Sequence, residues 1–181
     1  MHVSDQGVNS GRYSVIPRVL IFLINKSRVL LLKGSPTKHL WANRFNGIGG
    51  HIEPGEDPSS AAYRELFEET GLSVIDIKQK ETQNPGLWLC GILIVSTGNN
   101  PGVCVFIFSG ETEKLILHES SEGSLHWVKL DEINSIPIVE DLPILIDRIK
   151  NMKQGDAPFS AISNYENGDL IVKFYPDIGN L

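Results

Sequence analysis

The segment over residues 50–72 constrains the fold more than any other part of this 181-residue chain, because it specifies both ends of a short helix. Asp57 is a favoured N-cap residue, and Pro58 suits the first helical position, where its missing N–H is not needed. Gly71 suits the left-handed position at which helices commonly end. These signals predict a helix over residues 58–70 that follows a glycine-led loop.

The predicted helix carries its acidic residues on one side. At about 100° per residue, Glu65, Glu68 and Glu69 fall within an arc of roughly 100°. The adjoining arc is apolar and consists of Ala62, Tyr63, Leu66 and Phe67. Carboxylates three and four positions apart repel one another on a helix surface, so this arrangement gains from cations or arginines placed among them. Oxygen ligands gathered in this way suit Mg²⁺ or Mn²⁺, which keep several waters and bind substrate phosphates.

The spacing of residues in this segment resembles the Nudix box, the signature of the Nudix hydrolase superfamily. The matching positions are Gly50, Glu56, Arg64, Glu65, Leu66, Glu68, Glu69, Gly71 and Leu72. At ordinary residue frequencies, chance agreement at all of them is about one in a million or rarer. A solvated acidic helix face is the usual explanation for a pair such as Glu68 and Glu69, and the complete pattern argues against it.

The resemblance implies a reaction and a role for each box residue. Nudix hydrolases cleave a nucleoside diphosphate linked to a further group X by attack of water on a phosphorus, assisted by divalent metal. The implied metal ligands are the main-chain carbonyl of Gly50 and the side chains of Glu65, Glu68 and Glu69. Glu65 is also a candidate general base. Arg64 is implied to pair with these glutamates and orient them, and Glu56 to support the same network.

Residues outside the box resemble those of MutT-type enzymes and their animal homologue, which hydrolyse oxidised purine nucleoside triphosphates such as 8-oxo-dGTP. The stretch over residues 45–50 looks like their Asn-Gly-x-Gly-Gly approach to the box. Asn46 matches an asparagine that hydrogen-bonds the purine, and its amide offers both a donor and an acceptor. Glu122 resembles a glutamate that gives an extra metal or water contact. Glu140 and Asp141 stand where the animal enzyme has an acidic pair that reads the base.

Other interpretations of these outer residues are open. Asn46 begins an Asn-Gly pair, which is frequent in turns. Glu140 and Asp141 also suit the N-terminus of a helix ahead of Pro143. An ADP-ribose or nucleotide-sugar hydrolase would use the same box, and Pro85 lies near the proline offset associated with ADP-ribose enzymes. A nucleotide sensor without hydrolysis is a third hypothesis, although such domains usually have broken box carboxylates.

Aromatic residues give a further candidate contact with a nucleobase. Trp41, Phe45 and Trp88 could each stack on a base, but aromatic side chains mostly fill protein interiors. The sequence alone leaves both roles open for all three.

Composition limits the compartments and the partners. With 41% hydrophobic and 21% charged residues, the chain suits a globular domain with its own core. Its formal net charge of −6, without a lysine-arginine block, argues against polymeric nucleic acid and favours a small nucleotide held through metal. Cys90 and Cys104 lack metal-ligand spacing and are expected to be free thiols. Without a signal sequence or an apolar run of 18 residues, we expect a cytoplasmic protein that does not bind membranes. A homodimer is one expected assembly, since many relatives dimerise.

Apolar periodicity and turn residues predict an α/β fold. Strands are predicted over residues 15–24, 28–33, 73–80, 87–96, 103–109, 125–130, 161–165 and 169–175, and helices over 58–70 and 142–152. The resemblance implies the Nudix fold, an α/β/α sandwich with a mixed β-sheet. We expect a flexible N-terminus over residues 1–12, a Nudix domain over 13–153 and a C-terminal extension over 154–181. That extension is predicted to form a hairpin around an Asn-Gly turn.

Overall fold

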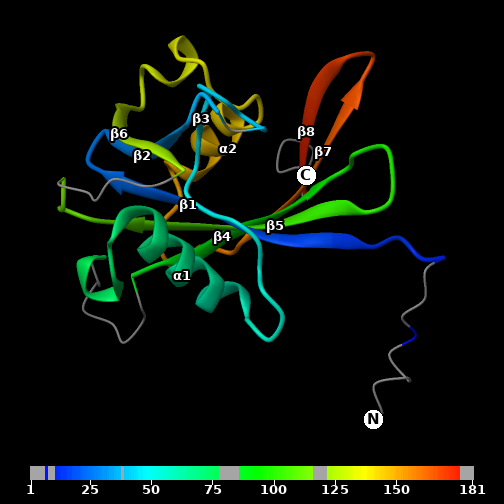
Figure 1. The fold of residues 1–181 in the computed structure, drawn as a ribbon, viewed down its shortest axis with the longest axis horizontal. Coiled ribbons are helices and arrows are strands. Elements are labelled where there is room, and N and C mark those ends of the chain that lie inside the picture. The colour runs from blue at the N-terminus through cyan, green and yellow to red at the C-terminus, as the bar shows by residue number, and fades with distance from the viewer. Residues whose placement is uncertain (1–6, 8–10, 38, 78–85, 116–121, 176–181) are drawn as a thin grey trace.

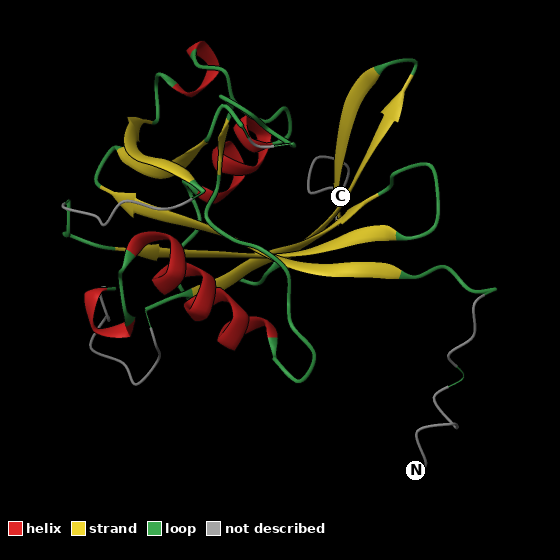
Figure 2. Cartoon of the chain, in the orientation of Figure 1, coloured by secondary structure: helices red, strands yellow, loops and turns green. Residues whose placement is uncertain are grey.

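A mixed β-sheet with a helix on each face makes up the body of the molecule in the computed structural model (Figure 1). The structure describes residues 7, 11–37, 39–77, 86–115 and 122–175. Its strands are β1 (Val15–Asn25), β2 (Arg28–Gly34), β3 (Phe45–Asn46), β4 (Trp88–Val95), β5 (Gly102–Glu111), β6 (Gly123–Lys129), β7 (Phe159–Glu166) and β8 (Asp169–Tyr175). Its helices are α1 (Pro58–Thr70) and α2 (Leu142–Ile149), with short 3-10 turns η2 (Val74–Asp76) and η3 (Ile133–Ser135) (Figure 2). The predicted flexible N-terminus lies largely outside the described residues.

The sheet combines parallel and antiparallel pairs. Among the described residues the strand order is β3-β2-β1-β5-β4-β7-β8, and β6 pairs with β2 beside this path. Strand β1 runs parallel to β5, and β4 runs parallel to β7. The pairs β1–β2, β2–β6, β4–β5 and β7–β8 are antiparallel. This arrangement confirms the predicted α/β fold with a mixed sheet.

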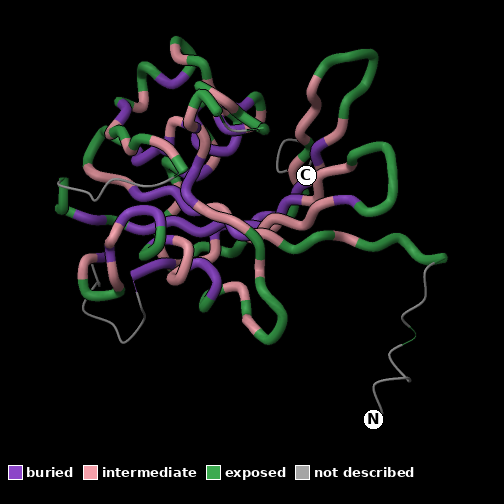
Figure 3. Tube along the Cα trace, viewed as in Figure 1, coloured by how far each residue is buried: buried purple, intermediate pink, exposed green. Residues whose placement is uncertain are grey.

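Alternate residues of β1 divide the core into two layers. Val19, Ile21 and Leu23 pack on one face in a cluster with buried residues of α1. Phe22 faces the other way, in a cluster with buried residues of α2. Side chains along a strand point alternately to the two faces of a sheet, so an apolar run of this kind is buried on both sides. Figure 3 shows buried stretches along the central strands of the sheet, where β1 and β5 lie side by side, and in parts of the helices.

Helix α1 begins and ends at the residues predicted from its caps. Asp57 Oδ1 accepts hydrogen bonds from the backbone N–H groups of Ser59 (2.8 Å) and Ser60 (3.1 Å). Gly71 has a left-handed backbone with φ of 71°, and its N–H donates to the carbonyl of Phe67 at 2.8 Å. The buried apolar face holds Ala61, Ala62 and Leu66. Glu69 is buried beside them, so the acidic residues lie along the edge of this face.

The strand predicted over residues 73–80 is wrong in its described part. Residues 74–76 form the 3-10 turn η2 instead. Asp76 Oδ2 accepts from both the N–H (2.8 Å) and the hydroxyl of Ser73 (3.0 Å), which closes the chain into a turn. Lys114 pairs with the same carboxylate, and the hydroxyl of Thr112 donates to the carbonyl of Asp76. These partners come from the segment after β5, beyond the reach of a local pattern.

The C-terminal hairpin joins the sheet through β7. Asn167 and Gly168 have φ values of 55° and 91°, as a tight hairpin turn requires, and they connect β7 to β8 as predicted. Figure 1 shows the hairpin rising away from the body of the sheet beyond β4. Helix α2 ends at Ile149, three residues before the predicted end. The domain boundary at residues 153 and 154 stays a prediction.

Both cysteines are free thiols, as the sequence predicted. Cys90 is buried in the layer shared with α2, and burial raises its pKa to about 12. A thiol with so high a pKa is protonated at neutral pH and is a poor nucleophile. Cys90 therefore acts as a core side chain.

Candidate active site

The glycine segment ahead of α1 is held in the sheet by β1. The N–H of Val19 donates to the carbonyl of Gly50 at 2.9 Å, and the N–H of Ile21 donates to the carbonyl of Ile48 at 2.7 Å. Gly49 has φ of 147°, and a β-carbon there would lie 2.2 Å from the carbonyl oxygen of Val19. Only glycine fits so close an approach of two backbones. The segment is thus fixed between β1 and the acidic flank of α1.

Two of the three acidic residues on the flank of α1 lie against this glycine segment. Glu69 is buried, with 4% of its surface exposed, and its Oε2 accepts from the N–H of Gly49 at 3.2 Å. The carboxylate of Glu65 packs on Gly50 so closely that a β-carbon would lie 2.3 Å from its Oε1. Glu68 is more open, with 56% of its side chain exposed. Because they have no side chains, Gly49 allows the close approach of the β1 backbone and Gly50 allows that of the Glu65 carboxylate.

Arg64 connects the loop with the acidic flank of α1. Its Nε and Nη2 donate to the two oxygens of Glu56 at 2.7 and 2.9 Å, a bidentate pair. Its Nη1 donates to Glu65 (2.8 Å) and Glu68 (3.1 Å), and Nη2 also donates to the carbonyl of His51 (2.9 Å). The planar guanidinium suits such forked contacts. Arg64 thus supplies the cation that an acidic helix face needs.

The pairing of Arg64 with Glu56 favours the charged form of both residues. The hydrogen bond from Arg64, with a further one from the N–H of Glu53, lowers the pKa of Glu56 to about 2. Glu56 and Glu65 in turn raise the pKa of Arg64 above its usual value. Charge-assisted hydrogen bonds favour the charged form of each partner. Glu56 and Arg64 are therefore both charged at neutral pH.

The oxygen donors of this cluster fit a hard divalent cation. Mg²⁺ takes one or two carboxylates and keeps several waters, so it needs no closed protein cage. Within the described residues, no three His, Cys, Asp or Glu side chains already converge on one point, and Arg64 binds Glu65 and Glu68 instead. The carbonyl of Gly50 accepts from Val19, and a carbonyl oxygen has a second lone pair. Carboxylate and carbonyl oxygens are the donors that such ions prefer.

The candidate base-reading residues meet on neighbouring backbone segments. The N–H of Phe45 donates to the carbonyl of Pro137 at 2.8 Å, and the N–H of Val139 donates to the carbonyl of Phe45 at 3.0 Å. This pairing sets β3, and with it Asn46, beside the segment that leads into Glu140 and Asp141. Asn46 also lies four residues before Gly50. The glycine segment therefore links the acidic cluster to these residues.

Asn46 and Glu122 each use some of their atoms in contacts within the protein. Asn46 lies in β3 rather than in a turn, and its Oδ1 accepts from the N–H of Gly47 at 2.8 Å, so its amide NH₂ is the group left for a ligand. Glu122 is exposed just before β6, where its carbonyl accepts from the N–H of Ser35 at 3.1 Å. A metal contact from Glu122 stays a prediction. Pro85 lies outside the described residues.

A cavity of about 120 Å³ lies between this segment and the C-terminal hairpin. Trp41 on one side and Ser163 and Tyr165 of β7 on the other line it together with Glu140 and Asp141. Trp41 has φ of 62°, which is strained for a bulky residue, and 43% of its surface is exposed. Backbone strain of this kind is often found at functional sites.

The two acidic residues beside the cavity have different surroundings. Glu140 Oε2 accepts from the hydroxyl of Tyr165 at 2.7 Å, and Glu140 Oε1 lies 3.7 Å from Nη1 of Arg44. Asp141 Oδ1 is buried and, within the part of the chain that the structure describes, has no hydrogen-bond partner. Burial raises the pKa of Asp141. The neutral carboxyl is therefore favoured there more than at the protein surface.

Sequence reasoning missed Tyr165 and Arg44 altogether. Neither residue belongs to a motif, and both reach Glu140 only through the fold. Among the aromatic candidates, Trp41 borders the cavity, whereas Phe45 is buried in the core. Trp88 is half-buried against the same core. The structure therefore favours Trp41 as the ring that a ligand could reach.

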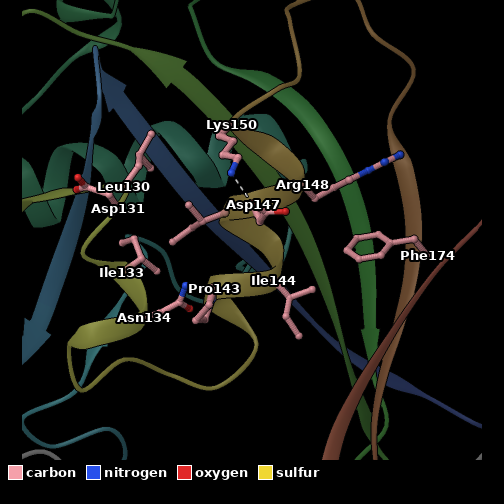
Figure 4. Close-up of a pocket in the computed structure, with 11 residues that line it drawn as sticks. Leu130, Asp131, Ile133, Asn134, Pro143, Ile144, Asp147, Arg148, Lys150 and Phe174 are labelled. Carbon is pink, nitrogen blue, oxygen red and sulfur yellow. Dashed lines mark ion pairs between the residues drawn. The ribbon is translucent and has the colours of Figure 1, made fainter.

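A larger groove of about 490 Å³ lies elsewhere, along the outer side of α2 (Figure 4). Arg148 lies over the ring of Phe174 at 5.6 Å, and Asp147 pairs with Lys150 at 2.5 Å. None of the residues that we identified from the sequence lines this groove. Its lining holds charges of both signs, unlike the acidic flank of α1.

Comparison with known proteins identifies the class. The family model described as NUDIX domain matches residues 15–149. An oxidized purine nucleoside triphosphate hydrolase of Mus musculus is 30% identical over 135 residues, which cover 72% of this chain and 80% of the mouse protein. A prenyl-diphosphate phosphatase of Methanosarcina mazei is 32% identical over 130 residues, or 69% of each chain. The crystal structure of a MutT protein from Bacillus halodurans superposes with a TM-score of 0.69 at 20% identity, covering 90% of this chain and 99% of that one.

The match over residues 15–149 includes the glycine segment, α1 and the cavity residues up to α2. The chain therefore belongs to the NUDIX family and is a MutT-like Nudix hydrolase. Hydrolases of this family generally use divalent metal ions. Of the helices that the structure describes, none has the length and apolarity to span a membrane.

Proposed function

We propose that this Nudix hydrolase is an Mg²⁺-dependent pyrophosphohydrolase of nucleoside triphosphates, with an oxidised purine nucleotide such as 8-oxo-dGTP as its preferred substrate. The observation that carries the proposal is the adjacency of two regions. A charged cluster suited to metal and phosphate sits at one end of the glycine segment, and Asn46 lies at the other end beside Glu140 and Asp141. The mouse relative named for this activity supports the choice of substrate.

The acidic cluster would perform the chemical step. Glu65, Glu68, Glu69 and the carbonyl of Gly50 would hold Mg²⁺, or Mn²⁺ in its place. When bound, the ion supplies charge stabilisation at the phosphate oxygens and makes a water easier to deprotonate. Glu65 would take the proton of the attacking water, because its carboxylate lies against the backbone of Gly50. Arg64 would keep the carboxylates oriented while Glu56 holds Arg64 in place.

The cavity would receive the base. Asp141 lines the cavity and would offer carboxyl oxygens to the base edge, while the amide NH₂ of Asn46, on the neighbouring β3, would offer donors to a ring nitrogen or carbonyl. Trp41 would stack on the ring, at about 0.5–1.5 kcal/mol beyond burial for a typical aromatic pair. Glu122 would add a metal or water contact near the phosphates.

The net charge and the free thiols support proposals for the ligand and the compartment of the protein. A net charge of −6 disfavours a polymeric nucleic acid and is compatible with a free nucleotide held through metal. The two free thiols fit a reducing compartment, so we place the protein in the cytoplasm. A homodimer stays a prediction, to be checked by the solution mass.

The test is a substrate panel with Mg²⁺. Release of phosphate and of pyrophosphate is measured with 8-oxo-dGTP, dGTP, ADP-ribose, ADP-glucose, Ap4A and a prenyl diphosphate, with EDTA as the control. We expect pyrophosphate from 8-oxo-dGTP, at a kcat/KM about ten times that for dGTP or more. Highest turnover of ADP-ribose or ADP-glucose would favour the alternative hydrolase. Tight binding of a nucleotide without any turnover would favour a sensor.

A further inference from the structure

Arg18 on β1 is a cation that the described part of the fold leaves without a partner. Its side chain is half-buried, and its Nε is shielded from solvent yet has no hydrogen-bond partner within the described residues. No carboxylate in the part of the chain that the structure describes forms an ion pair with it. Arg64, by contrast, donates hydrogen bonds to three carboxylates. A half-buried charge costs folding free energy unless an opposite charge or a ligand pairs with it.

Arg18 lies on the same face of the sheet as the cavity. Leu20 belongs to the core layer shared with α2, and Arg18, two residues earlier on the same strand, points to that face. The partner of Arg18 across β5 is Val105, whose partner on β4 is Leu93, and both pack in this layer. Val95, two residues after Leu93, lines the cavity. The cavity wall therefore begins two strand spacings, or about 10 Å, across the sheet from Arg18.

On its other side, Arg18 borders the glycine segment. Its backbone forms a bridge with that of His51, and the next residue, Val19, donates its N–H to the carbonyl of Gly50 at 2.9 Å. Glu69 reaches the same segment from the face that α1 covers. Arg18 is therefore placed between the cavity on one face of the sheet and the acidic cluster on the other.

A nucleotide with its base in the cavity and its terminal phosphates at the acidic cluster has to cross this stretch of β1. The phosphate nearest the sugar is the anionic group between its two ends. A guanidinium presents two parallel N–H donors that match two oxygens of a phosphate, and Nε–H is one of these donors.

We infer that Arg18 binds the phosphate nearest the nucleoside, with its Nε–H and a neighbouring N–H donating to the two nonbridging oxygens. This inference rests on the proposed function, because it places the base in the cavity. It goes further by assigning a phosphate contact that involves neither metal nor the acidic cluster.

The test is ligand binding in EDTA, which removes every contact made through metal. Titration calorimetry compares 8-oxo-dG with 8-oxo-dGMP, and adenosine with AMP, because the members of each pair differ only in the phosphate. Arg18→Met keeps a long apolar side chain and removes the guanidinium. We expect this variant to bind each monophosphate about 10- to 100-fold more weakly and each nucleoside as the wild type does. Arg18→Lys keeps the charge without the fork and should recover part of the loss.

A control variant and a stability measurement separate binding from structural support. Arg28→Met is the control, because Arg28 is an exposed arginine at the start of β2, and it should leave every affinity unchanged. An arginine that supports the fold would lower the unfolding temperature when replaced. Since Arg18 has an unpaired Nε, we expect Arg18→Met to unfold at or above the wild-type temperature. A lower unfolding temperature with unchanged monophosphate affinity would overturn the inference.

The outcomes also separate this inference from the proposed function. Equal monophosphate affinity in Arg18→Met and wild type would overturn the phosphate contact and leave the hydrolase intact. An equal loss for nucleoside and monophosphate would overturn it too, because the guanidinium would then contact the base. A loss for the monophosphates alone supports the contact even where the wild type hydrolyses none of the panel, which removes only the proposed hydrolysis. A wild type that binds neither monophosphate and hydrolyses no nucleotide would overturn both.

Discussion

The acidic cluster on α1 and the cavity beside the C-terminal hairpin are built in opposite ways. The cluster draws its carboxylates and its cation from a single stretch of sequence between residues 49 and 69, and Arg64 alone makes hydrogen bonds to three carboxylates. The cavity draws its walls from segments as distant as Trp41 and Tyr165. The proposed chemical step depends on residues spaced closely in the sequence. The proposed specificity depends on residues that are distant in the sequence and that the fold brings together.

The two regions also handle charge differently. In the cluster Arg64 pairs with Glu56, Glu65 and Glu68, which lowers the pKa of Glu56 and raises that of Arg64. In the cavity burial, with the neighbouring charge of Glu140, raises the pKa of Asp141. A network of opposite charges suits metal and phosphate, while a buried carboxyl group with a perturbed pKa suits a ligand-binding site. The difference implies that substitutions in the two regions alter different kinetic constants.

The largest expected effect is that of Glu69→Gln in the acidic cluster. Glutamine keeps an oxygen that accepts from Gly49 but loses the negative charge proposed to hold the metal. We expect kcat on 8-oxo-dGTP to fall by about 100-fold or more, with an unchanged circular dichroism spectrum.

Glu132→Gln is the control, because Glu132 is an exposed residue paired with Lys129 far along the chain. It should leave kcat and KM unchanged. A Glu69→Gln enzyme with near-normal Mg²⁺-dependent turnover would remove the cluster from the mechanism.

A smaller and different effect is expected from Asp141→Asn in the cavity. The amide cannot ionise, and its NH₂ donates where a carboxylate oxygen accepts, so KM for 8-oxo-dGTP should rise about tenfold while kcat changes little. The matched control is Asp147→Asn, since Asp147 is 72% exposed in its side chain and pairs with Lys150 on α2. A fall in kcat without a change in KM would contradict a role in base reading.

The same variant reports on stability. Because burial raises the pKa of Asp141 above its unfolded value, ionising it at higher pH costs folding free energy. Asp141→Asn should therefore be at least as stable as the wild type at pH 8. That advantage should shrink as the pH falls through the raised folded pKa, and it should be gone below the ordinary aspartate pKa of about 3.9, where the wild-type group is neutral in both states. Thermal unfolding across this pH range measures it.

Glu56→Gln should have the smallest effect. The pKa of Glu56 is lowered from 4.5 to about 2, so its pairing with Arg64 contributes stability above pH 4.5 and loses it as the pH falls toward 2. The unfolding temperature of the variant should lie slightly below that of the wild type at pH 7, and the gap should close near pH 2. Solvent screening keeps the difference small. A gap that widens in acid would contradict this pairing.

The contrast between the two regions also explains which features could be predicted from the sequence. The limits of α1 were predictable because Asp57, Pro58 and Gly71 act on the backbone next to them. The acidic side of α1 was predictable because Glu65, Glu68 and Glu69 recur at helical spacing, while their roles in the reaction stay a prediction. Strand alternation placed most of the sheet for the same local reason.

Contacts between distant segments were not predictable in this way. The turn at residues 74–76 replaced an expected strand because Lys114 and Thr112 hold Asp76 from the far end of β5. The hydrogen bond from Tyr165 to Glu140 has no signal in either local sequence. Such pairs arise only after the chain is folded, so the cavity was the part of the site left incomplete.

The separation of chemistry from specificity is tested most directly by the ratio of kcat/KM for 8-oxo-dGTP to kcat/KM for dGTP in three proteins. In Glu69→Gln both values should fall together, so that the ratio equals that of the wild type. In Asp141→Asn the ratio should collapse toward one while dGTP turnover persists. A ratio that changes in Glu69→Gln and stays constant in Asp141→Asn would contradict the account.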